Sequence, residues 1–440
     1  MADLSINIKG MKAPNPFFLA SAPPATYGEQ IKRAFEAGWG GVVTKTIGID
    51  PIVNVTNRFG RLTQRGARQG AANVIGFENI ELITDRPVES WLRDIRMLKE
   101  TFPDRAVVAS LMHSVEEEGW RQLVLAVQEA GADAIELNFG CPHGMPEKHM
   151  GSEQSQDPAI ANMICGWVHK YATVPVFAKL TPNVTDIGLI GQACEAGGAD
   201  GISTINTILS MIGIDIEDVH PLPDVSGKSC YGGYSGTSVK PVGLRCVSTL
   251  KAKTSLPLFG MGGINYAEDA IEYILAGASA VQVCTAVMLR GFRIIDNLVK
   301  GLNDYMDRKG FNTIDEMVGL AVPRVTVHSG LNFKRREVAL IDQAKCISCD
   351  LCYVACNDGV GLSAIDKTFN VVEAARGGEA ADGGSDPAKT RPVYEVINEK
   401  CDGCSLCLQV CPVKDCITLV ESDTYRVPPM WRPEEERVLA

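Results

Sequence analysis

The sequence lacks an apolar run long enough to span a bilayer, and it has no excess of basic residues. Its 42 lysine and arginine residues are outnumbered by 53 aspartate and glutamate residues, which gives a formal net charge of -11. That charge argues against nucleic acid or an anionic membrane surface as the main partner. The first residues show no basic segment followed by a long apolar core, so we expect no signal peptide and a cytoplasmic location.

A glycine fingerprint for dinucleotides is also missing. No G-x-G-x-x-G motif follows an apolar run anywhere in the 440 residues. In a Rossmann domain this motif lets the backbone approach the pyrophosphate of the bound dinucleotide. We therefore place no nicotinamide site on this chain.

Cysteine, in contrast, is abundant and unevenly distributed. Of the 15 cysteines, six are scattered before residue 300 and nine lie between Cys346 and Cys416. Disulfides are disfavoured in a reducing compartment, so clustered cysteines there indicate metal or redox chemistry. The distribution predicts two domains, residues 1–330 and residues 331–440.

Eight short apolar runs divide the first three quarters of the chain, beginning at residues 16, 41, 106, 134, 176, 201, 256 and 280. Such runs suit parallel strands buried on both faces, and helical stretches lie between them. The segments "EAGWGGV", "EAGADAI", "GGADGIS" and "AGASAVQ" each close a helix with glycine before a strand begins. This pattern predicts an α/β fold, a TIM-type (β/α)8 barrel, with a doubly wound open sheet as the alternative on spacing alone.

Polar side chains follow five of these runs, at the points where the strands should end. In a barrel the carboxyl ends of the strands converge on one face, where such enzymes place their chemistry. "GMGGI" from residue 260 and "VCTAV" from residue 283 follow the last two strands, where barrels often bind phosphate. Together with two lysines, these segments fit flavin mononucleotide (FMN). The polar residues are Ser21, Thr44, Lys45, Thr46, Asn138, Lys179, Asn206 and Thr207.

Two cysteine runs in the last quarter repeat the spacing C-x2-C-x2-C-x3-C. This is the bacterial two-cluster ferredoxin pattern, in which the fourth cysteine of each run reaches the other cluster. Structural zinc, the alternative, usually joins separated cysteine pairs. Residues 373–392 between the runs cannot bury a core, so we expect a mobile surface insert. The spacing predicts a small α+β ferredoxin-like domain with one [4Fe–4S] cluster on Cys346, Cys349, Cys352 and Cys411, and a second on Cys401, Cys404, Cys407 and Cys356.

Motifs over nearly the whole chain resemble those of dihydropyrimidine dehydrogenases, among them "LASAPPAT", "NIELI", "ELNFGCPHGM", "FAKLTPNVTDI" and the cysteine runs. The length is similar to that of the flavin and iron–sulfur subunit of the bacterial NAD-dependent enzymes. The resemblance implies reduction of uracil and thymine to their 5,6-dihydro forms, the first step of reductive pyrimidine catabolism. It also implies a separate NAD(H)- and FAD-binding partner subunit, in a hetero-oligomer that contains a homodimer of this chain.

The resemblance also implies residue roles. Substrate contacts fall on Asn79, Glu81, Asn138, Phe139, Gly140, Asn206 and Thr207. FMN contacts fall on Ser21, Lys45, Thr46, Lys179, Gly236, Gly262, Gly263, Ile264, Thr285 and Ala286.

Cys141, on a loop bounded by Gly140 and Pro142, resembles the general acid of the family. In that scheme a hydride passes from the flavin N5 to C6 of the pyrimidine, and Cys141 gives a proton to C5. A thiol with a pKa of about 8.5 is protonated at neutral pH yet acidic enough to donate. The alternative is a small buried hydrophobic residue, and we expect the neighbouring His143 to be structural.

Two rival functions remain open. One is a dihydroorotate dehydrogenase-like barrel fused to a ferredoxin, and the other is an electron-transfer subunit whose barrel is catalytically idle. "NIELI" and "CPHGM" favour uracil or thymine over orotate. A carboxylate-bearing substrate such as orotate should also need a dedicated cation, and the sequence identifies none.

Overall fold

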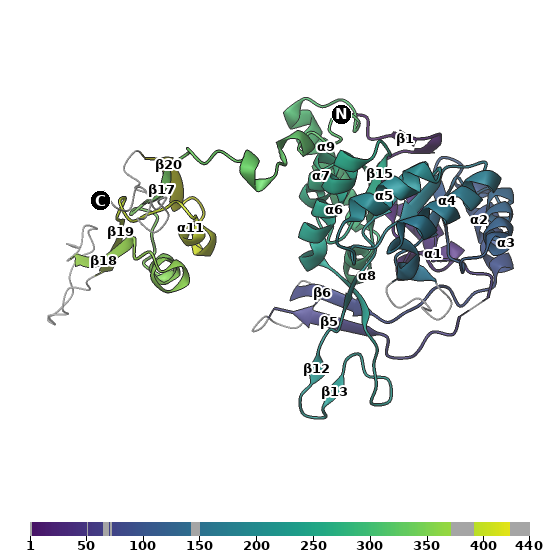
Figure 1. The fold of residues 1–440 in the computed structure, drawn as a ribbon, viewed down its shortest axis with the longest axis horizontal. Helices are drawn as coiled ribbons and strands as arrows, with labels where there is room; N and C mark the ends of the chain where they lie inside the picture. The colour runs from purple at the N-terminus through teal and green to yellow at the C-terminus, as the bar shows by residue number, and fades with distance from the viewer. Residues whose placement is uncertain are drawn as a thin grey trace, which may run out of the picture. The chain divides into compact units, whose positions relative to one another are not determined.

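The computed structural model describes residues 2–50, 52–64, 70, 73–141, 150–370 and 391–422. The chain forms two compact units, Met1–Val325 and Thr326–Ala440 (Figure 1). The boundary expected from the cysteine distribution, between residues 330 and 331, lies just beyond this division. Residue His143 and residues 373–390 of the expected insert lie outside the described residues.

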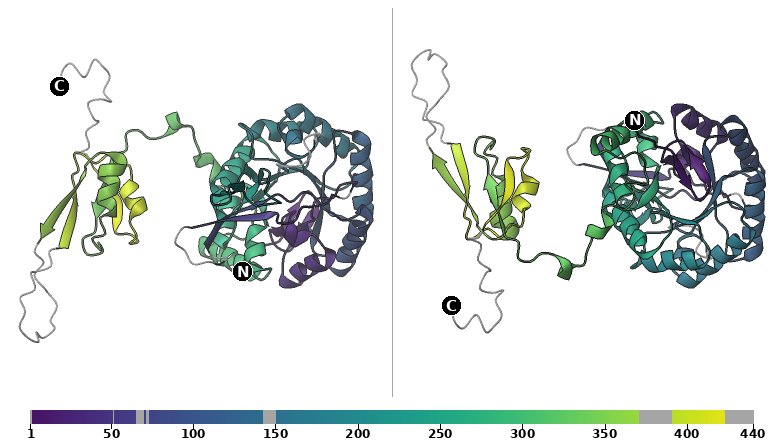
Figure 2. Two further views of the ribbon diagram at one scale, coloured as in Figure 1. Left: turned by 90° about the horizontal axis from the view of Figure 1, so that it is seen from below. Right: turned by 90° about the horizontal axis from the view of Figure 1, so that it is seen from above.

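The eight predicted strands close into a parallel barrel in the order β10-β15-β16-β3-β4-β7-β8-β9. Figure 2 shows the helices as an outer ring around these strands. The predicted barrel is therefore confirmed, and the open-sheet alternative is wrong. The strands are β3 (Phe17–Leu19), β4 (Gly41–Val43), β7 (Ala106–Leu111), β8 (Ala134–Asn138), β9 (Val176–Lys179), β10 (Gly201–Thr204), β15 (Leu258–Met261) and β16 (Ala278–Val283).

Each helix of the ring lays an apolar face on the strands. Helix α1, for example, buries Ile31, Ala34 and Phe35. The glycines of the four repeated segments, Gly38, Gly131, Gly198 and Gly277, all have positive φ angles, as a left-handed helix end requires. The helices are α1 (Gly28–Ala37), α2 (Val88–Thr101), α3 (Glu117–Glu129), α4 (Pro158–Tyr171), α5 (Ile187–Ala196), α6 (Lys240–Lys253), α7 (Ala267–Leu275), α8 (Thr285–Arg290) and α9 (Ile294–Lys309).

Short 3-10 turns connect several of these elements. They are η1 (Pro23–Ala25), η4 (Gly151–Ser155), η5 (Thr237–Val239), η6 (Val322–Arg324) and η7 (His328–Gly330). Among the described residues, no helix combines the length and the apolar character needed to cross a membrane.

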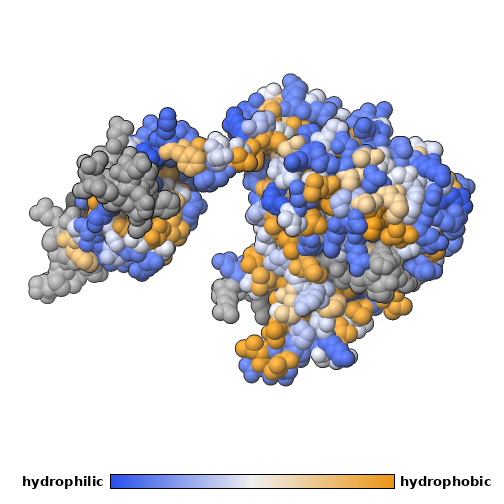
Figure 3. Space-filling model, viewed as in Figure 1, coloured by the Kyte–Doolittle hydropathy of each residue, from blue (hydrophilic) through white to orange (hydrophobic). Residues whose placement is uncertain are grey.

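A four-stranded antiparallel sheet, which the sequence did not predict, is inserted after two barrel strands. Its order is β11-β14-β6-β5, so segments that follow β4 pair with segments that follow β10. Figure 3 shows apolar surface on the adjoining hairpin, where Ile214, Ile216 and Val219 are exposed. These strands are β5 (Phe59–Thr63), β6 (Val74–Asn79), β11 (Ile208–Ser210), β12 (Ile214–Asp215), β13 (His220–Pro221) and β14 (Gly232–Ser235), and a separate N-terminal hairpin holds β1 (Ile6–Ile8) and β2 (Met11–Ala13).

The second unit contains two antiparallel strand pairs, β17 with β20 and β18 with β19. The expected insert is shorter than predicted, because Arg391 and Pro392 already belong to β19 and pair with Asn370 and Phe369. The elements are β17 (Glu337–Ile341), α10 (Leu351–Val354), the π-helical turn η8 (Ala355–Val360), β18 (Ile365–Asn370), β19 (Arg391–Val396), α11 (Leu406–Val410) and β20 (Ile417–Glu421).

We predict that Gly41→Ala destabilises the barrel, because a Cβ there would lie 2.2 Å from the fully buried Phe18 ring. Phe18 packs edge-on against Phe259, with ring centroids 4.9 Å apart, so it has no room to move. Overpacking typically costs about 1–3 kcal/mol, and the thermal unfolding midpoint should fall. Gly166→Ala in α4 is the control, since its nearest neighbour atom lies 3.9 Å away. Equal midpoints for both variants would contradict this packing.

Candidate active site

A pocket opens at the carboxyl ends of the barrel strands, and the four-stranded sheet forms part of its wall. It contains about 1120 Å³ of empty space, including solvent at its mouth. Most of the residues to which the sequence assigned substrate or FMN contacts come together here. They are Ser21, Lys45, Thr46, Asn79, Glu81, Asn138, Cys141, Lys179, Asn206, Thr207, Gly236, Gly262, Gly263, Ile264, Thr285 and Ala286.

Phe139 and Gly140 are not among the pocket-lining residues. Phe139 belongs to the hydrophobic core, where its ring packs edge-on against Trp120 at a centroid distance of 6.2 Å. Gly140 has no side chain to offer, and a Cβ there would lie 2.5 Å from the Asn206 Cβ. Its amide donates to Asn138 Oδ1 at 3.3 Å, so Gly140 helps to orient the Asn138 side chain.

Two asparagines, one at the end of β8 and one just after β10, are linked side chain to side chain across the end of β9. Asn206 Nδ2 donates to Asn138 Oδ1 at 2.8 Å, and Asn138 Nδ2 donates to Thr46 Oγ1 at 2.9 Å. Thr46 in turn bonds the Ser21 and Ser110 hydroxyls at 3.1 and 2.9 Å. This chain of bonds fixes the direction in which each amide presents its donors and acceptors.

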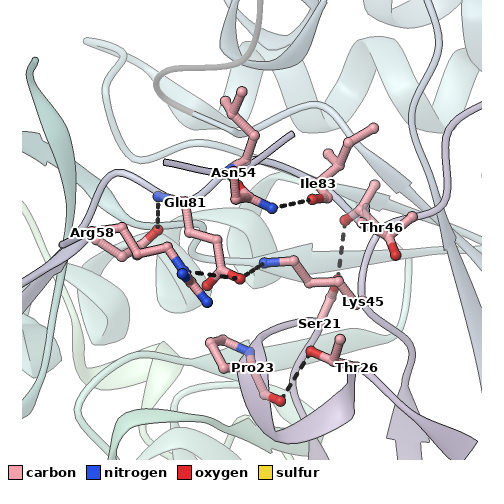
Figure 4. Close-up of polar contacts among 12 residues, drawn as sticks. Ser21, Pro23, Thr26, Lys45, Thr46, Asn54, Arg58, Glu81 and Ile83 are labelled. Carbon is pink, nitrogen blue, oxygen red and sulfur yellow. Dashed lines mark hydrogen bonds and ion pairs between the residues drawn. The ribbon is translucent and has the colours of Figure 1, made fainter. Parts of the chain in front are cut away.

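Lys45 lies beside a carboxylate at the pocket wall. Its Nζ is 3.4 Å from Glu81 Oε1, and Arg58 Nε approaches the same oxygen at 3.7 Å. In Figure 4 the Glu81 carboxylate points between the two cations. The side chains of Lys45 and Glu81 are each 9% exposed, so solvent screens this pair little.

Lys179 is paired in the same way, deeper in the barrel. Its Nζ lies 3.2 Å from Glu136 Oε1, and Gln282 Nε2 donates to Glu136 Oε2 at 2.7 Å. Both lysines that the sequence associated with FMN therefore already face a carboxylate. An anionic group needs other donors.

Three glycines elsewhere in the pocket lining offer backbone N–H groups as donors. Gly236, Gly262 and Gly263 have φ angles of 99°, 121° and 74°, where a side chain would be strained. A Cβ on Gly263 would also lie 2.9 Å from the Lys240 Cβ. Gln282 Oε1, in the pocket wall, has no hydrogen-bond partner among the described residues. These residues fit FMN. The glycine backbone suits its phosphate, and Gln282 suits a polar edge of its ring.

Cys141 borders the pocket at 8% exposure, in a small apolar cluster with Ile83, Met112 and Met150. The sequence missed a second pocket thiol, Cys284, which follows β16. Burial raises the pKa of Cys284 to about 11, which makes it a poorer proton donor than an ordinary thiol.

Aromatic side chains of the four-stranded sheet were also missed. Phe59, Phe77 and Tyr234 line the pocket, and the first two rings lie 5.5 Å apart. Their strands are short and mixed in character, so no apolar run marked them in the sequence.

The second unit brings the cysteines into two groups around two separate small cavities. One cavity is lined by Cys346, Cys349, Cys352 and Cys411, with Cys416 alongside. The other is lined by Cys356, Cys401, Cys404 and Cys407. Each group takes three cysteines from one run and one from the other, the arrangement that a pair of ferredoxin clusters needs.

Backbone amides point at the sulfurs of both groups. Ser348 N lies 3.4 Å from Cys346 Sγ, Ala364 N lies 3.3 Å from Cys356 Sγ, and Ala339 N lies 3.5 Å from Cys401 Sγ. Amide donors of this kind stabilise the negative charge of cluster thiolates. The cysteines present fit two [4Fe–4S] clusters.

Two family models match the chain. Residues 3–306 match dihydroorotate dehydrogenase, and residues 339–419 match a 4Fe-4S dicluster domain. These matches agree with FMN and two [4Fe–4S] clusters as the cofactors.

Similar proteins align over most of this length. The chloroplastic dihydropyrimidine dehydrogenase (NADP(+)) of Arabidopsis thaliana is 42% identical over 351 residues, 78% of this chain and 82% of the relative. The NAD-dependent dihydropyrimidine dehydrogenase subunit PreA of Escherichia coli K12 is 41% identical over 360 residues, 81% and 86% respectively. The catalytic subunit of dihydroorotate dehydrogenase B (NAD(+)) of Pyrococcus abyssi is 39% identical over 321 residues, 72% and 99%.

Among solved structures, DHODH of Eimeria tenella in complex with ferulenol shares the fold. Its TM-score is 0.60 at 21% identity, and the match covers 72% of this chain and 88% of that one.

We predict that Glu136 and Lys179 are energetically coupled. Removing one partner of a buried ion pair typically costs about 3–5 kcal/mol, because the other charge remains buried and unpaired. Glu136→Gln and Lys179→Met should each lower the thermal unfolding midpoint of the flavin-free chain. The double variant should be more stable than the sum of the two losses implies. Strict additivity would show that the two side chains do not interact.

Proposed function

The chain belongs to the dihydropyrimidine dehydrogenase family, and from this we propose that it reduces uracil and thymine to 5,6-dihydrouracil and 5,6-dihydrothymine. The two relatives that carry this name align with about four fifths of the chain. Each alignment is longer than the 304 residues of the barrel model.

The single observation that carries this proposal is that a carboxylate already faces each buried lysine of the pocket. Lys45 and Arg58 face Glu81, and Lys179 faces Glu136. A uracil ring is neutral and gains nothing from a spare cation, whereas the orotate carboxylate would meet Glu81 and its paired cations. Burying an unpaired carboxylate is costly, so this pocket favours a neutral heterocycle.

The linked amides suit the polar edges of a pyrimidine. Asn138 and Asn206 are held by each other and by Thr46, while Asn79 and Thr207 also line the pocket. A uracil edge alternates carbonyl acceptors with N–H donors, and a side-chain amide carries one acceptor and two donors. We assign these four residues to substrate orientation.

The chemical step needs one proton donor at the pocket, and we assign Cys141 to this role. When bound, FMN supplies a hydride to one face of the pyrimidine ring. Cys141 then gives its thiol proton to C5, and the side chains of Asn138 and Asn206 donate to the oxygen on which negative charge develops. We assign the acid to Cys141 and not to Cys284, because burial raises the pKa of Cys284 to about 11 and makes it a weaker acid than an ordinary thiol.

Reduction of one pyrimidine consumes two electrons and two protons. The eight cysteines of the two cavities would hold the [4Fe–4S] clusters, which would supply one-electron chemistry when bound. We assign the source to a separate NAD(H)- and FAD-binding subunit, because the chain has no dinucleotide fingerprint. The Escherichia coli relative is likewise named a subunit. A homodimer of this chain within that assembly is part of the same proposal.

Orotate chemistry is the second candidate function. The family model over residues 3–306 carries the dihydroorotate dehydrogenase name, and the Pyrococcus relative is a dihydroorotate dehydrogenase B subunit. Glu81 is the observation that weighs against it in this chain.

Cys141→Ser should keep the flavin and both clusters but lose most turnover, at least about 100-fold, because a serine hydroxyl is a far weaker acid than a thiol. Reduction of uracil with an artificial electron donor measures this. Cys230→Ser, at an exposed cysteine, is the matched control and should retain wild-type turnover. Undiminished turnover of Cys141→Ser at neutral pH would remove Cys141 from the mechanism.

Glu81→Gln should shift binding from uracil toward orotate, because it leaves Lys45 and Arg58 without their carboxylate. Titrating the flavin absorption of the wild type and the variant with each ligand gives the ratio of dissociation constants. We expect that ratio to move at least about tenfold toward orotate, the effect of roughly 1.4 kcal/mol. Glu81→Asp, which keeps the charge, should move it much less. No change in the ratio would disprove the charge argument.

A further inference from the structure

The two cysteine runs of the second unit have equivalent backbones. Ser348 and Asp350 in the first run have φ angles of 58° and 66°, and Gly403 and Ser405 in the second have 72° and 64°. Each pair occupies the same places relative to its cysteines, so the two cluster sites can be compared position by position. The backbone is repeated, but the side chains around it are not.

The first site is flanked by a lysine that its counterpart lacks. Lys367 Nζ lies 2.7 Å from Asp350 Oδ1, where the second run has the neutral Ser405. The buried Tyr394, which lines the cavity of the Cys346 group, donates its hydroxyl proton to Asp350. Lys367 Nζ is also 6.0 Å from the centre of the Tyr394 ring. One side chain therefore separates this ammonium from the cavity.

A second cation approaches the same site from β19. Arg391 Nε donates to Ser348 Oγ at 2.7 Å, and the amide of Ser348 points at Cys346 Sγ. Lys345 stands next to Cys346 in the chain. Lys345 pairs with Asp342 at 3.5 Å, and Lys367 pairs with Asp350. These three cations therefore exceed the two carboxylates by one charge.

The second site has the opposite balance. Glu399, Asp402 and Asp358 lie within two residues of its cysteines, and Lys400 is the one cation in those positions. Asp402 Oδ1 accepts from the amide of Cys404 at 3.0 Å, which holds this carboxylate beside the cysteine run. The rest of the cavity wall is largely aliphatic, with Val360, Leu362, Ala364, Ile365, Val396 and Leu406.

Amide donors to the cysteine sulfurs also raise the reduction potential of a cluster, and they favour the second site, but their effect is weaker. Among the described residues two amides point at sulfurs of the second site and one points at a sulfur of the first. A single N–H···S contact carries a partial charge. Within two residues of the cysteines, the first site has Lys345 and Asp350 and is neutral, whereas the second carries two net negative charges. The potential of an iron–sulfur cluster rises with positive charge around it, so the charges decide.

We propose that the cluster held by Cys346, Cys349, Cys352 and Cys411 has the higher reduction potential, and that Lys367 is a positioning residue that raises it. An electron on the other cluster then moves downhill to this one: the cluster of Cys401, Cys404, Cys407 and Cys356 is oxidised by one electron as the first is reduced. At equilibrium, a single electron in this unit therefore resides mainly on the first cluster. The inference rests on the two cluster sites and not on the pyrimidine reaction.

The test is an anaerobic redox titration of the full chain with both clusters assembled, followed by electron paramagnetic resonance. The wild type should show two resolved one-electron midpoints. Lys367→Gln keeps a hydrogen-bond donor for Asp350 but removes the charge. It should lower the higher midpoint so that the reduced-to-oxidised ratio there changes about tenfold, the order expected for one charge at about 10 Å and an effective dielectric constant of about 20. For one electron that factor corresponds to about 59 mV.

Two further variants make the result decisive. Lys367→Arg keeps the charge and should restore the wild-type higher midpoint. Asp402→Asn keeps the acceptor for the Cys404 amide and should raise only the lower midpoint. The proposal is overturned if Lys367→Gln moves the lower midpoint, moves both equally or moves neither. It is also overturned if Asp402→Asn moves the higher one. Iron and sulfide content verify cluster assembly, and no outcome depends on turnover of uracil.

Discussion

Two buried lysine–carboxylate pairs decide what the barrel pocket can hold. Lys45 with Glu81 and Lys179 with Glu136 place whole charges where water has little access, and each buried lysine faces a carboxylate before any ligand arrives. The buried lysines are therefore already paired when a ligand enters. In the proposed function, a phosphate would contact glycine backbone and a heterocycle would contact oriented amides, so specificity would depend mainly on the direction of hydrogen bonds. Because each lysine is paired, it could lie near a flavin without binding the carboxylate of a substrate.

The scaffold places these groups by closing a sheet on itself. Lys45 follows β4, and Asn138 and Lys179 end β8 and β9, so the barrel brings three separated segments to one pocket. The inserted sheet adds aromatic rings to the pocket wall, and Glu81 follows its strand β6. Chemistry therefore comes from strand ends and selectivity largely from the insertions, a division that (β/α)8 enzymes commonly show.

The sequence predicted the barrel strands, because each is a near-continuous apolar run that can be recognised without knowing which strands it pairs with. It also predicted the grouping of the eight cysteines, since the thiol spacing reflects the geometry of the cluster itself. It did not reveal the inserted sheet, whose strands are short and partly exposed, nor the pairing of Lys179 with Glu136. That pairing depends on two strands lying side by side in register, Asn138 opposite Lys179, and Glu136 reads in the sequence as an ordinary strand residue. Phe139 was misplaced because a family motif names neighbours without saying which way each side chain points.

The central claim is that electrons held on this chain reduce a neutral pyrimidine at the flavin. The most direct measurement starts from the full chain reduced anaerobically with dithionite, with excess reductant removed, and follows the flavin absorption as uracil is added. The account predicts that oxidised flavin reappears in proportion to the uracil added, with dihydrouracil as the product, and that orotate has little effect. Flavin that stays reduced in the presence of uracil would contradict it.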